Sequence, residues 1–260
     1  MVFSSIPFLY YFLPAVLAVY FLTPRKGKNA VLLLASLIFY GWGELRLLPL
    51  MVFPIGLCYV CGLGIERSRN RKKLWLLASI VISVGLLGVF KYADFFIGSL
   101  NAVTGLKIPL LHLALPVGIS FYTFQCLSYT IDVYRGSVPA QKSLINFGAY
   151  VALFPQLIAG PIVRYADIAR ELEHREHSWD NAAAGLRRFL VGLGKKVILA
   201  DNFALLIRLF RQSGETSVLF YWMYAVAFAL NIYFDFSGYS DMAIGLGRVL
   251  GFHFVENFNY

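Results

Sequence analysis

Eight apolar runs, separated by short polar segments, organise the chain. They cover about residues 6–23, 30–43, 47–65, 74–92, 111–133, 143–163, 188–210 and 217–250. A helix needs about 20 apolar residues to cross the ~30 Å hydrocarbon core of a bilayer, and most of the runs approach that length. The pattern predicts an all-α fold, a polytopic transmembrane helical bundle. We expect a single membrane domain over residues 1–260, because no linker or internal repeat interrupts it.

The run at 143–163 differs from the others because Pro155, Gly160 and Pro161 interrupt it. Proline removes a backbone hydrogen bond from a helix, and irregular backbone at membrane depth is tolerated only inside protein or beside a cavity. The pattern favours a probable re-entrant segment near 143–163 over a complete crossing, although the mixed charges of 164–187 fit either path. The polar stretch 164–187 itself predicts an amphipathic helix on the membrane surface.

Composition narrows the class of protein. The chain is 59% hydrophobic and only 14% charged, whereas soluble domains carry about 25% charged residues. A large soluble domain and a disordered chain are both excluded. The net charge of +9 comes from short basic clusters between apolar runs. That arrangement is typical of membrane orientation and argues against nucleic-acid binding.

The cysteines and histidines give little evidence of a metal or redox site. Three cysteines make a disulfide framework unexpected. Cys58 and Cys61 lie three residues apart in an apolar run, and we interpret them as small buried side chains on one helix face. His174 and His177 form a sparse zinc pattern in a solvated segment, so no metal is expected. His253 is interpreted as a surface histidine, with a general base as the alternative.

The strongest local signal is a group of polar residues within the last apolar run, YFDFSGYSD at Tyr233–Asp241. Each carboxylate inside a membrane costs about 2.5–3.5 kcal/mol, so such groups usually face a cavity or a partner. We expect Asp235 and Asp241 to line a polar cavity. The alternative is structural, with either carboxylate paired to Arg164 or Arg248 or capping a helix.

A second signal is FPQLIAGPIVR at Phe154–Arg164, inside the interrupted run. Gln156 and Arg164 have the chemistry to bond the carbonyls that the prolines free, or to bind an anionic group of a substrate. A kinked packing helix is the alternative interpretation.

Three stretches carry a resemblance to a known family. They are LPVGISFYTFQCLSYTIDVYR at Leu115–Arg135, FPQLIAGPIVR at Phe154–Arg164 and YFDFSGYSDMAIGLGRVLGFHFVENFNY at Tyr233–Tyr260. Together with the opening MVFSSIPFLYYFLP and FKYADFF at 90–96, they resemble the membrane-bound O-acyltransferase (MBOAT) family. The similarity is to its bacterial branch, typified by alginate O-acetylation proteins, and it runs over essentially the whole chain.

The resemblance implies an enzyme of the bacterial cytoplasmic (inner) membrane that moves an acyl group onto a hydroxyl. In this branch, acetyl passes across the membrane to an exported, alginate-like polysaccharide or to a periplasmic or membrane partner acetyltransferase. The donor is acetyl-CoA or another acyl carrier, and no bound cofactor is expected. A membrane-embedded funnel would serve this chemistry, because the donor and the acceptor reach the membrane from opposite faces.

The resemblance also implies that the catalytic histidine of the family lies beyond Tyr260. No catalytic residue is therefore assigned, and residues 1–260 alone are expected not to catalyse acyl transfer, since the reaction needs a placed base. The expected substrate-binding residues of the funnel are Gln125, Gln156, Arg164, Asp235, Ser237, Tyr239 and Asp241.

Two other classes of function remain open at this point. One is a non-enzymatic membrane scaffold that docks a partner acetyltransferase, which the position of the family histidine favours for this chain. The other is a small-anion transporter, whose broken helices would resemble the interrupted run. Inverted repeats would favour a transporter, and the sequence displays none.

The positive-inside rule predicts an N-out topology with residues 24–28 and 66–73 in the cytoplasm, because the basic residues follow alternate runs. We expect a cysteine at position 107, replacing Lys107, to react with a membrane-impermeant maleimide on intact cells. A cysteine replacing Lys26 should react only after the cells are opened. Labelling of position 26 from outside would contradict this topology.

Overall fold

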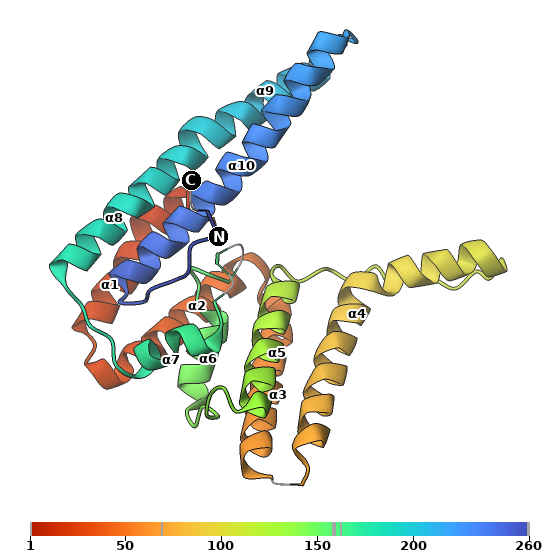
Figure 1. Ribbon diagram of the computed structural model, residues 1–260. Helices are drawn as coiled ribbons and strands as arrows, with labels where there is room; N and C mark the ends of the chain where they lie inside the picture. Colours follow the sequence, from red (N-terminus) through yellow and green to blue (C-terminus); the bar gives the residue numbers. More distant parts are fainter. Residues whose placement is uncertain (1, 69, 158–159, 162, 259–260) are drawn as a thin grey trace. The chain divides into compact units, whose positions relative to one another are not determined.

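Helices form all the regular structure in the described part of the chain, residues 2–68, 70–157, 160–161 and 163–258 of a computed structural model (Figure 1). The all-α fold is therefore confirmed. The α-helices are α1 (Leu13–Leu22), α2 (Lys28–Glu44), α3 (Leu48–Arg67), α4 (Lys72–Thr104), α5 (Ile119–Arg135), α6 (Leu144–Ala152), α7 (Tyr165–Glu173), α8 (Trp179–Gly194), α9 (Asp201–Ser213) and α10 (Val218–Val249). Short π or 3-10 turns are η1 (Pro7–Phe12), η2 (Arg25–Gly27), η3 (Leu45–Leu47) and η4 (Lys195–Ala200).

The chain divides into two compact units. Unit 1 comprises Met1–Val19, Ala159–Val163 and Glu173–Tyr260, and unit 2 comprises Tyr20–Ile158 and Arg164–Leu172. The expectation that residues 1–260 make one membrane domain stays a prediction.

Three helical stretches in the described residues are long and apolar enough to cross a membrane, namely Leu45–Arg67, Lys72–Thr104 and Val218–Val249. Their lengths of 23, 33 and 32 residues exceed the roughly 20 that a crossing needs. Pro7–Leu22 is a shorter apolar helix. The membrane character expected from the apolar runs is confirmed, whereas a total of eight crossings stays a prediction.

Two predicted boundaries around α4 and α5 are wrong. Residues 93–104 were expected in a loop, but they continue α4, which ends where Gly105 takes a left-handed conformation (φ 74°). Residues 111–118, expected to begin the next span, are not helical, and α5 starts only after Gly118 (φ 76°). Hydropathy alone misplaced both boundaries, because a left-handed glycine ends or precedes a helix regardless of how apolar its neighbours are.

The connection between α4 and α5 is held along α4 by side-chain hydrogen bonds. The Asp94 carboxylate accepts from the backbone N–H of Leu111 at 2.7 Å and of His112 at 3.0 Å. The Asn101 side chain donates to the carbonyl of Ile108 and accepts from its N–H. These bonds satisfy backbone groups that a helix would otherwise have paired internally.

The interrupted run does not form one continuous helix. Helix α6 has nine residues, about 14 Å, which is half of a hydrocarbon core. Residues 153–157 that follow it are turns and irregular backbone, and residues 158, 159 and 162 lie outside the described residues. The break at the prolines is as expected, while re-entry into the bilayer stays a prediction. In the polar stretch 164–187, α7 is a short amphipathic helix with Tyr165, Ile168 and Leu172 buried. Residues 174–178 are not helical and α8 begins at Trp179, so the prediction of one helix is confirmed only for α7, and its place on the membrane surface stays a prediction.

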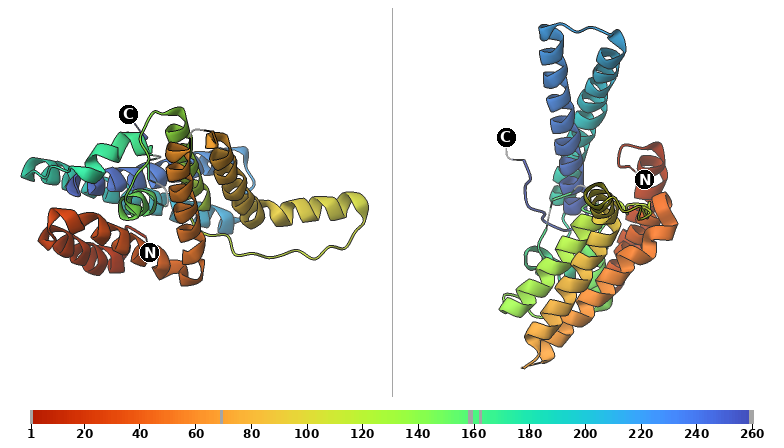
Figure 2. Two further views of the ribbon diagram at one scale, coloured as in Figure 1. Left: turned by 90° about the horizontal axis from the view of Figure 1, so that it is seen from below. Right: turned by 90° about the vertical axis from the view of Figure 1, so that its right-hand side faces the viewer.

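Unit 2 is a bundle in which α3 packs on α4 and α5, and α2 packs on α6 (Figure 2). Long-range polar contacts join its elements. The Asn29 side-chain amide donates to Asn146 Oδ1 at 2.8 Å and to the carbonyl of Leu172 at 2.7 Å. Gln141 donates through its side chain to the Tyr165 hydroxyl at 2.9 Å. Buried amides with partners of this kind position the short helices α6 and α7 against the longer ones.

Unit 1 is built on a long antiparallel helical hairpin. Helices α8 and α9, joined by η4, run along α10 (Figure 2). Two glycine pairs bring α8 and α10 together. A Cβ atom on Gly185 would lie 2.6 Å from the Gly245 carbonyl oxygen, and one on Gly192 would lie 2.6 Å from that of Gly238. Only glycine permits backbones to approach this closely, as in tightly packed membrane helices.

Gly192→Ala is expected to destabilise unit 1 by about 1–3 kcal/mol, because the added methyl group must push the backbones apart. The matched control is Gly194→Ala in the same helix, where an added Cβ would meet nothing within 4 Å. Thermal unfolding of the purified full-length gene product in detergent compares the two. Equal melting temperatures would contradict the tight seam.

Candidate functional site

The carboxylate of Asp241 on α10 is held between two cations. Its Oδ1 accepts from Arg188 Nε at 3.0 Å and Nη2 at 2.9 Å, and its Oδ2 accepts from Lys195 Nζ at 2.6 Å. The Asp241 side chain is only 14% exposed. Charge-assisted hydrogen bonds in such a partly buried setting compensate for the water that the carboxylate loses.

Arg188 connects this pair to the segment after α10. Both of its terminal nitrogens donate to the Glu256 carboxylate. Hydrogen bonding to the Arg188 guanidinium holds the pKa of Glu256 below its ordinary value. Arg188 therefore ties α8 to α10 and to the chain beyond it.

Asp235 belongs to a second, more exposed cluster. Lys196 Nζ lies 2.6 Å from Asp235 Oδ1 and 3.1 Å from Asp201 Oδ1. The Asp235 side chain is 52% exposed. The adjacent residues Lys195 and Lys196 of η4 thus form ion pairs with different carboxylates of α10, which lie six residues apart.

The alternative interpretation, in which the α10 carboxylates form ion pairs, agrees with the contacts inside unit 1, but the partners there are not Arg248. In the described part of unit 1 the two carboxylates pair with cations of α8 and η4. The reason is the helix crossing, because the glycine seam places α8 beside α10. A pairing with Arg164, which belongs to unit 2, stays a prediction. That the two carboxylates also line a polar cavity stays a prediction.

The other predicted residues of α10 lie on the same helix as these pairs. Ser237 is fully buried, and the ring of Tyr239 stacks on Phe3 at 4.5 Å between centroids. Within the described residues, the hydroxyls of Ser237 and of its neighbour Ser240 have no hydrogen-bond partner. Buried hydroxyls of this kind are normally satisfied, so both are available to water or to a polar group of a ligand.

The remaining predicted site residues lie in unit 2. Gln125 of α5 is 7% exposed and Gln156 is 3% exposed, while Arg164 is exposed. Gln156 Nε2 donates to the Tyr150 carbonyl at 2.6 Å, so it satisfies a carbonyl at the end of α6, which was one of its two expected roles. Its Oε1 is buried and without a partner among the described residues.

Arg164 marks the start of α7. Its backbone N–H donates to Asp167 Oδ2 at 3.0 Å, and the Asp167 N–H donates back to the Arg164 carbonyl at 3.1 Å. This reciprocal arrangement stabilises the first turn of the helix. The predicted site residues are therefore divided between the units, and a common funnel stays a prediction.

The sequence analysis missed Arg188, Lys195 and Lys196. A signal for the first two was present, because Gly185, Arg188, Gly192 and Lys195 recur at the spacing of one helix face. The matching face of α10 carries Gly238, Asp241 and Gly245. Pairing the two small-residue faces would have suggested the ion pairs.

The cysteines and histidines are the other candidates for a reactive or metal-binding site. Cys58, Cys61 and Cys126 are free and buried. Among the described residues, no three or more His, Cys, Asp and Glu side chains gather as a metal site would require. His253 is exposed. The expectations of no metal and of a catalytic histidine beyond Tyr260 stay predictions.

Comparison with known proteins defines the class to which this hairpin and broken segment belong. Residues 139–260 match the model of MBOAT, the membrane-bound O-acyltransferase family, and this region includes α6 to α10. Relatives match over the whole chain at 44–45% identity. The chain therefore belongs to the membrane-bound O-acyltransferase family, as its motifs indicated.

The chain is similar to particular members of this family. It is 44% identical over 266 residues to the "Probable alginate O-acetylase AlgI" of Azotobacter vinelandii, covering 100% of this chain and 53% of the relative. The protein of that name from Pseudomonas aeruginosa is 45% identical, with 100% and 51% covered. The "Peptidoglycan O-acetyltransferase" of Helicobacter pylori is 33% identical, with 100% and 56% covered. The chain spans about half the length of these relatives.

Asp241→Asn is expected to lower the free energy of unfolding of unit 1 by about 2 kcal/mol, because it leaves two partly buried cations without their shared anion. This value lies between those typical of exposed and of buried ion pairs. Asp235→Asn, at a half-exposed pair, should cost less than about 1 kcal/mol. Melting temperatures of the two purified variants test the difference. A larger loss for Asp235→Asn would contradict the assigned roles.

Proposed function

We propose that the full-length gene product containing this chain O-acetylates an exported polysaccharide. The observation that carries the proposal is the 44–45% identity over the whole chain to two proteins named as alginate O-acetylases. A relative named as a peptidoglycan O-acetyltransferase, at 33% identity, also points to a glycan acceptor. Both names imply the same chemistry, an acetyl group transferred to a sugar hydroxyl.

The proposed donor is a cytoplasmic acyl thioester, acetyl-CoA or another acyl carrier. Such donors are anionic and made in the cytoplasm, whereas the polymer is exported. The transfer therefore needs a protein that spans the cytoplasmic (inner) membrane, which the three apolar stretches support. The further partners of the proposal are the lipid bilayer, the polysaccharide and a periplasmic or membrane acetyltransferase that completes the transfer.

The described residues support binding and positioning in this reaction. Ser237, Ser240 and the Oε1 of Gln156 are buried polar groups that a substrate or water would satisfy. The three cations of the α8–η4 face are paired with carboxylates, so their first role is to hold the hairpin together. Proton abstraction from the acceptor hydroxyl is left to a base outside this set.

Deletion of the gene in the source bacterium tests the proposal. We expect base-labile acetyl groups to disappear from the exported polysaccharide and to return on expression of the wild-type gene. An unchanged acetyl content after deletion would overturn the proposed function. Expression of Ser237→Ala is the site-directed arm, with Gly194→Ala as its matched control, because an added Cβ at Gly194 meets nothing within 4 Å. We expect Ser237→Ala to lower acetylation at an unchanged protein level.

The donor is tested separately. Inside-out membrane vesicles of the source bacterium, loaded with its periplasmic extract and the polysaccharide so that the partner acetyltransferase is present, receive radiolabelled acetyl-CoA on their exposed cytoplasmic face. Label in the enclosed polysaccharide is measured, with vesicles of the deletion strain as the control. Transfer of label to the polysaccharide supports acetyl-CoA as the acyl donor. If deletion abolishes acetylation but no label moves, acetyl-CoA is wrong and the polysaccharide function stands.

A further inference from the structure

The segment that follows α10 turns back along that helix. Gly251, with a φ of 86°, makes the reversal, and the Phe252 N–H donates to the Gly247 carbonyl at 2.8 Å. The ring of Phe254 then covers Gly247, because a Cβ atom on this glycine would lie 2.5 Å from the ring. We call residues 252–258 the strap, and its first residues are packed on the last turns of α10.

Two further contacts continue the strap toward the middle of α10. The Glu256 carboxylate accepts hydrogen bonds from Arg188, whose guanidinium also binds Asp241. The ring of Phe258 lies 5.7 Å from that of Tyr233, measured between centroids. Later residues of the strap thus meet earlier positions of the helix, so the strap runs antiparallel to α10.

Two buried serines of α10 lie at the strap. Ser240 is seven residues after Tyr233 and seven before Gly247, so all three share one face of the helix, and the strap packs on that face at both ends. Ser237 lies beside this face, three residues before Ser240. Both side chains are buried, and their hydroxyls have no hydrogen-bond partner among the described residues. Such groups are normally satisfied, so the strap covers two hydroxyls that the fold itself does not use.

The Arg188–Glu256 ion pair, which we call the latch, holds the middle of the strap. The Glu256 side chain is 45% exposed, so water competes for its charge, whereas Asp241 is only 14% exposed. Arg188 keeps Asp241 as its partner when the latch breaks, so release of the strap leaves no buried cation unpaired. Opening the strap is therefore expected to cost less free energy than unfolding the hairpin.

We propose that the strap opens and closes access to a polar site formed by the Ser237 and Ser240 hydroxyls, and that this site takes the carbonyl group of a small acyl thioester. Two hydroxyl donors suit an uncharged acceptor such as a carbonyl oxygen. The apolar rings of Phe254 and Phe258 suit a methyl group and offer no partners for the many hydroxyls of a sugar. The identity of this ligand rests on the proposed function, whereas the movement of the strap does not.

Cysteine labelling of the detergent-purified full-length gene product tests the strap. Ser240→Cys puts a thiol in place of the buried hydroxyl, and peptide mass spectrometry follows its reaction with N-ethylmaleimide. We expect slow labelling with the latch intact and about tenfold faster labelling in Glu256→Gln, the effect of losing a charge-assisted hydrogen bond. Phe258→Ala, which removes an aromatic contact and keeps the latch, should accelerate labelling about threefold.

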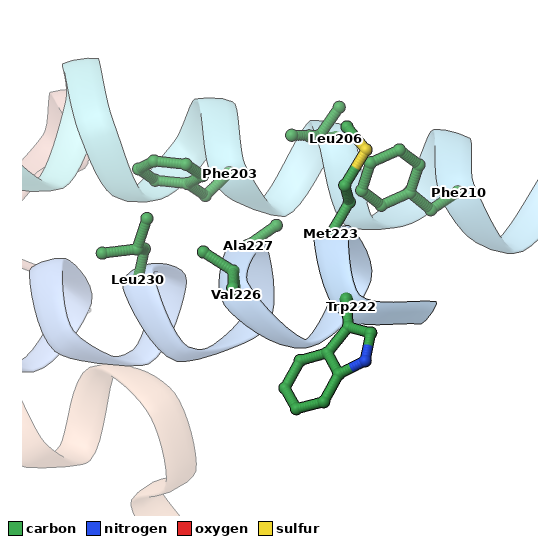
Figure 3. Close-up of a pocket in the computed structure, with 8 residues that line it drawn as sticks. All are labelled: Phe203, Leu206, Phe210, Trp222, Met223, Val226, Ala227 and Leu230. Atoms are coloured by element: carbon green, nitrogen blue, oxygen red, sulfur yellow. The ribbon is translucent and has the colours of Figure 1, made fainter. Parts of the chain in front are cut away.

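Two controls separate opening of the strap from other changes. Glu215→Gln removes a carboxylate at the turn between α9 and α10 and should leave the labelling rate at position 240 unchanged. Ala227→Cys places a thiol at a buried position of the same helix, in the apolar pocket that Figure 3 shows, and Glu256→Gln should not change its labelling. Equal rates at position 240 with and without the latch, or the same acceleration at both thiols, would overturn the proposal.

The ligand is tested in the protein that carries both Ser240→Cys and Glu256→Gln. S-ethyl thioacetate, a small acyl thioester, should slow the labelling of position 240 reversibly. Diethyl sulfide, in which a CH₂ group replaces the carbonyl, should not, and Ser237→Ala should abolish the protection by the thioester. Equal protection by the two compounds, or protection by neither, would overturn the acyl ligand. The deletion experiment on the exported polysaccharide reports on the proposed function separately.

Discussion

The close approach of α8 and α10 at two glycine pairs is the constraint on which unit 1 depends. Backbone oxygens occupy the space that a Cβ would need at Gly185 and Gly192, so the helices can touch only at these small residues. The same contact brings Arg188 and Lys195 within hydrogen-bonding distance of Asp241. The ion pairs beside the glycine seam offset the cost of placing the Asp241 carboxylate in an apolar helix, because this largely buried carboxylate meets two cations.

In unit 2, polar side chains satisfy backbone groups at the places where the backbone leaves helical geometry. The carbonyl of Tyr150 is satisfied by the Gln156 side chain, and the N–H of Phe154 donates to the Ser36 hydroxyl. The connection between α4 and α5 is paired in the same way by Asp94. Polar side chains within apolar runs are thus first a means of completing the backbone, and the groups that remain unsatisfied, such as Gln156 Oε1, are the better evidence for binding.

This distinction changes which residues are the better candidates for substrate binding. Asp235 and Asp241 looked like substrate ligands because they are charged, yet each pairs with a cation of α8 or η4 and so joins elements of unit 1. The bonds of Arg164 to Asp167 are made by its backbone, so the role of its exposed guanidinium stays a prediction. Ser237, and its neighbour Ser240, have buried hydroxyls without such contacts. For an O-acyltransferase, in which donor and acceptor must be held on opposite sides of a membrane, buried polar groups that the fold itself does not use are the more informative candidates.

The sequence by itself determined the membrane character, the helical class and the family, because hydropathy, periodicity and long motifs are local properties of the chain. It also located the break near Pro155, where the missing N–H of proline acts on its own helix. Only the tertiary structure decided that Asp241 pairs with Arg188 and Lys195 rather than with Arg248 of its own helix. It likewise decided that α4 continues to Thr104. The physical reason is that an ion pair between distant helices depends on which faces meet, and the close glycine contact that selects those faces forms only when the chain folds.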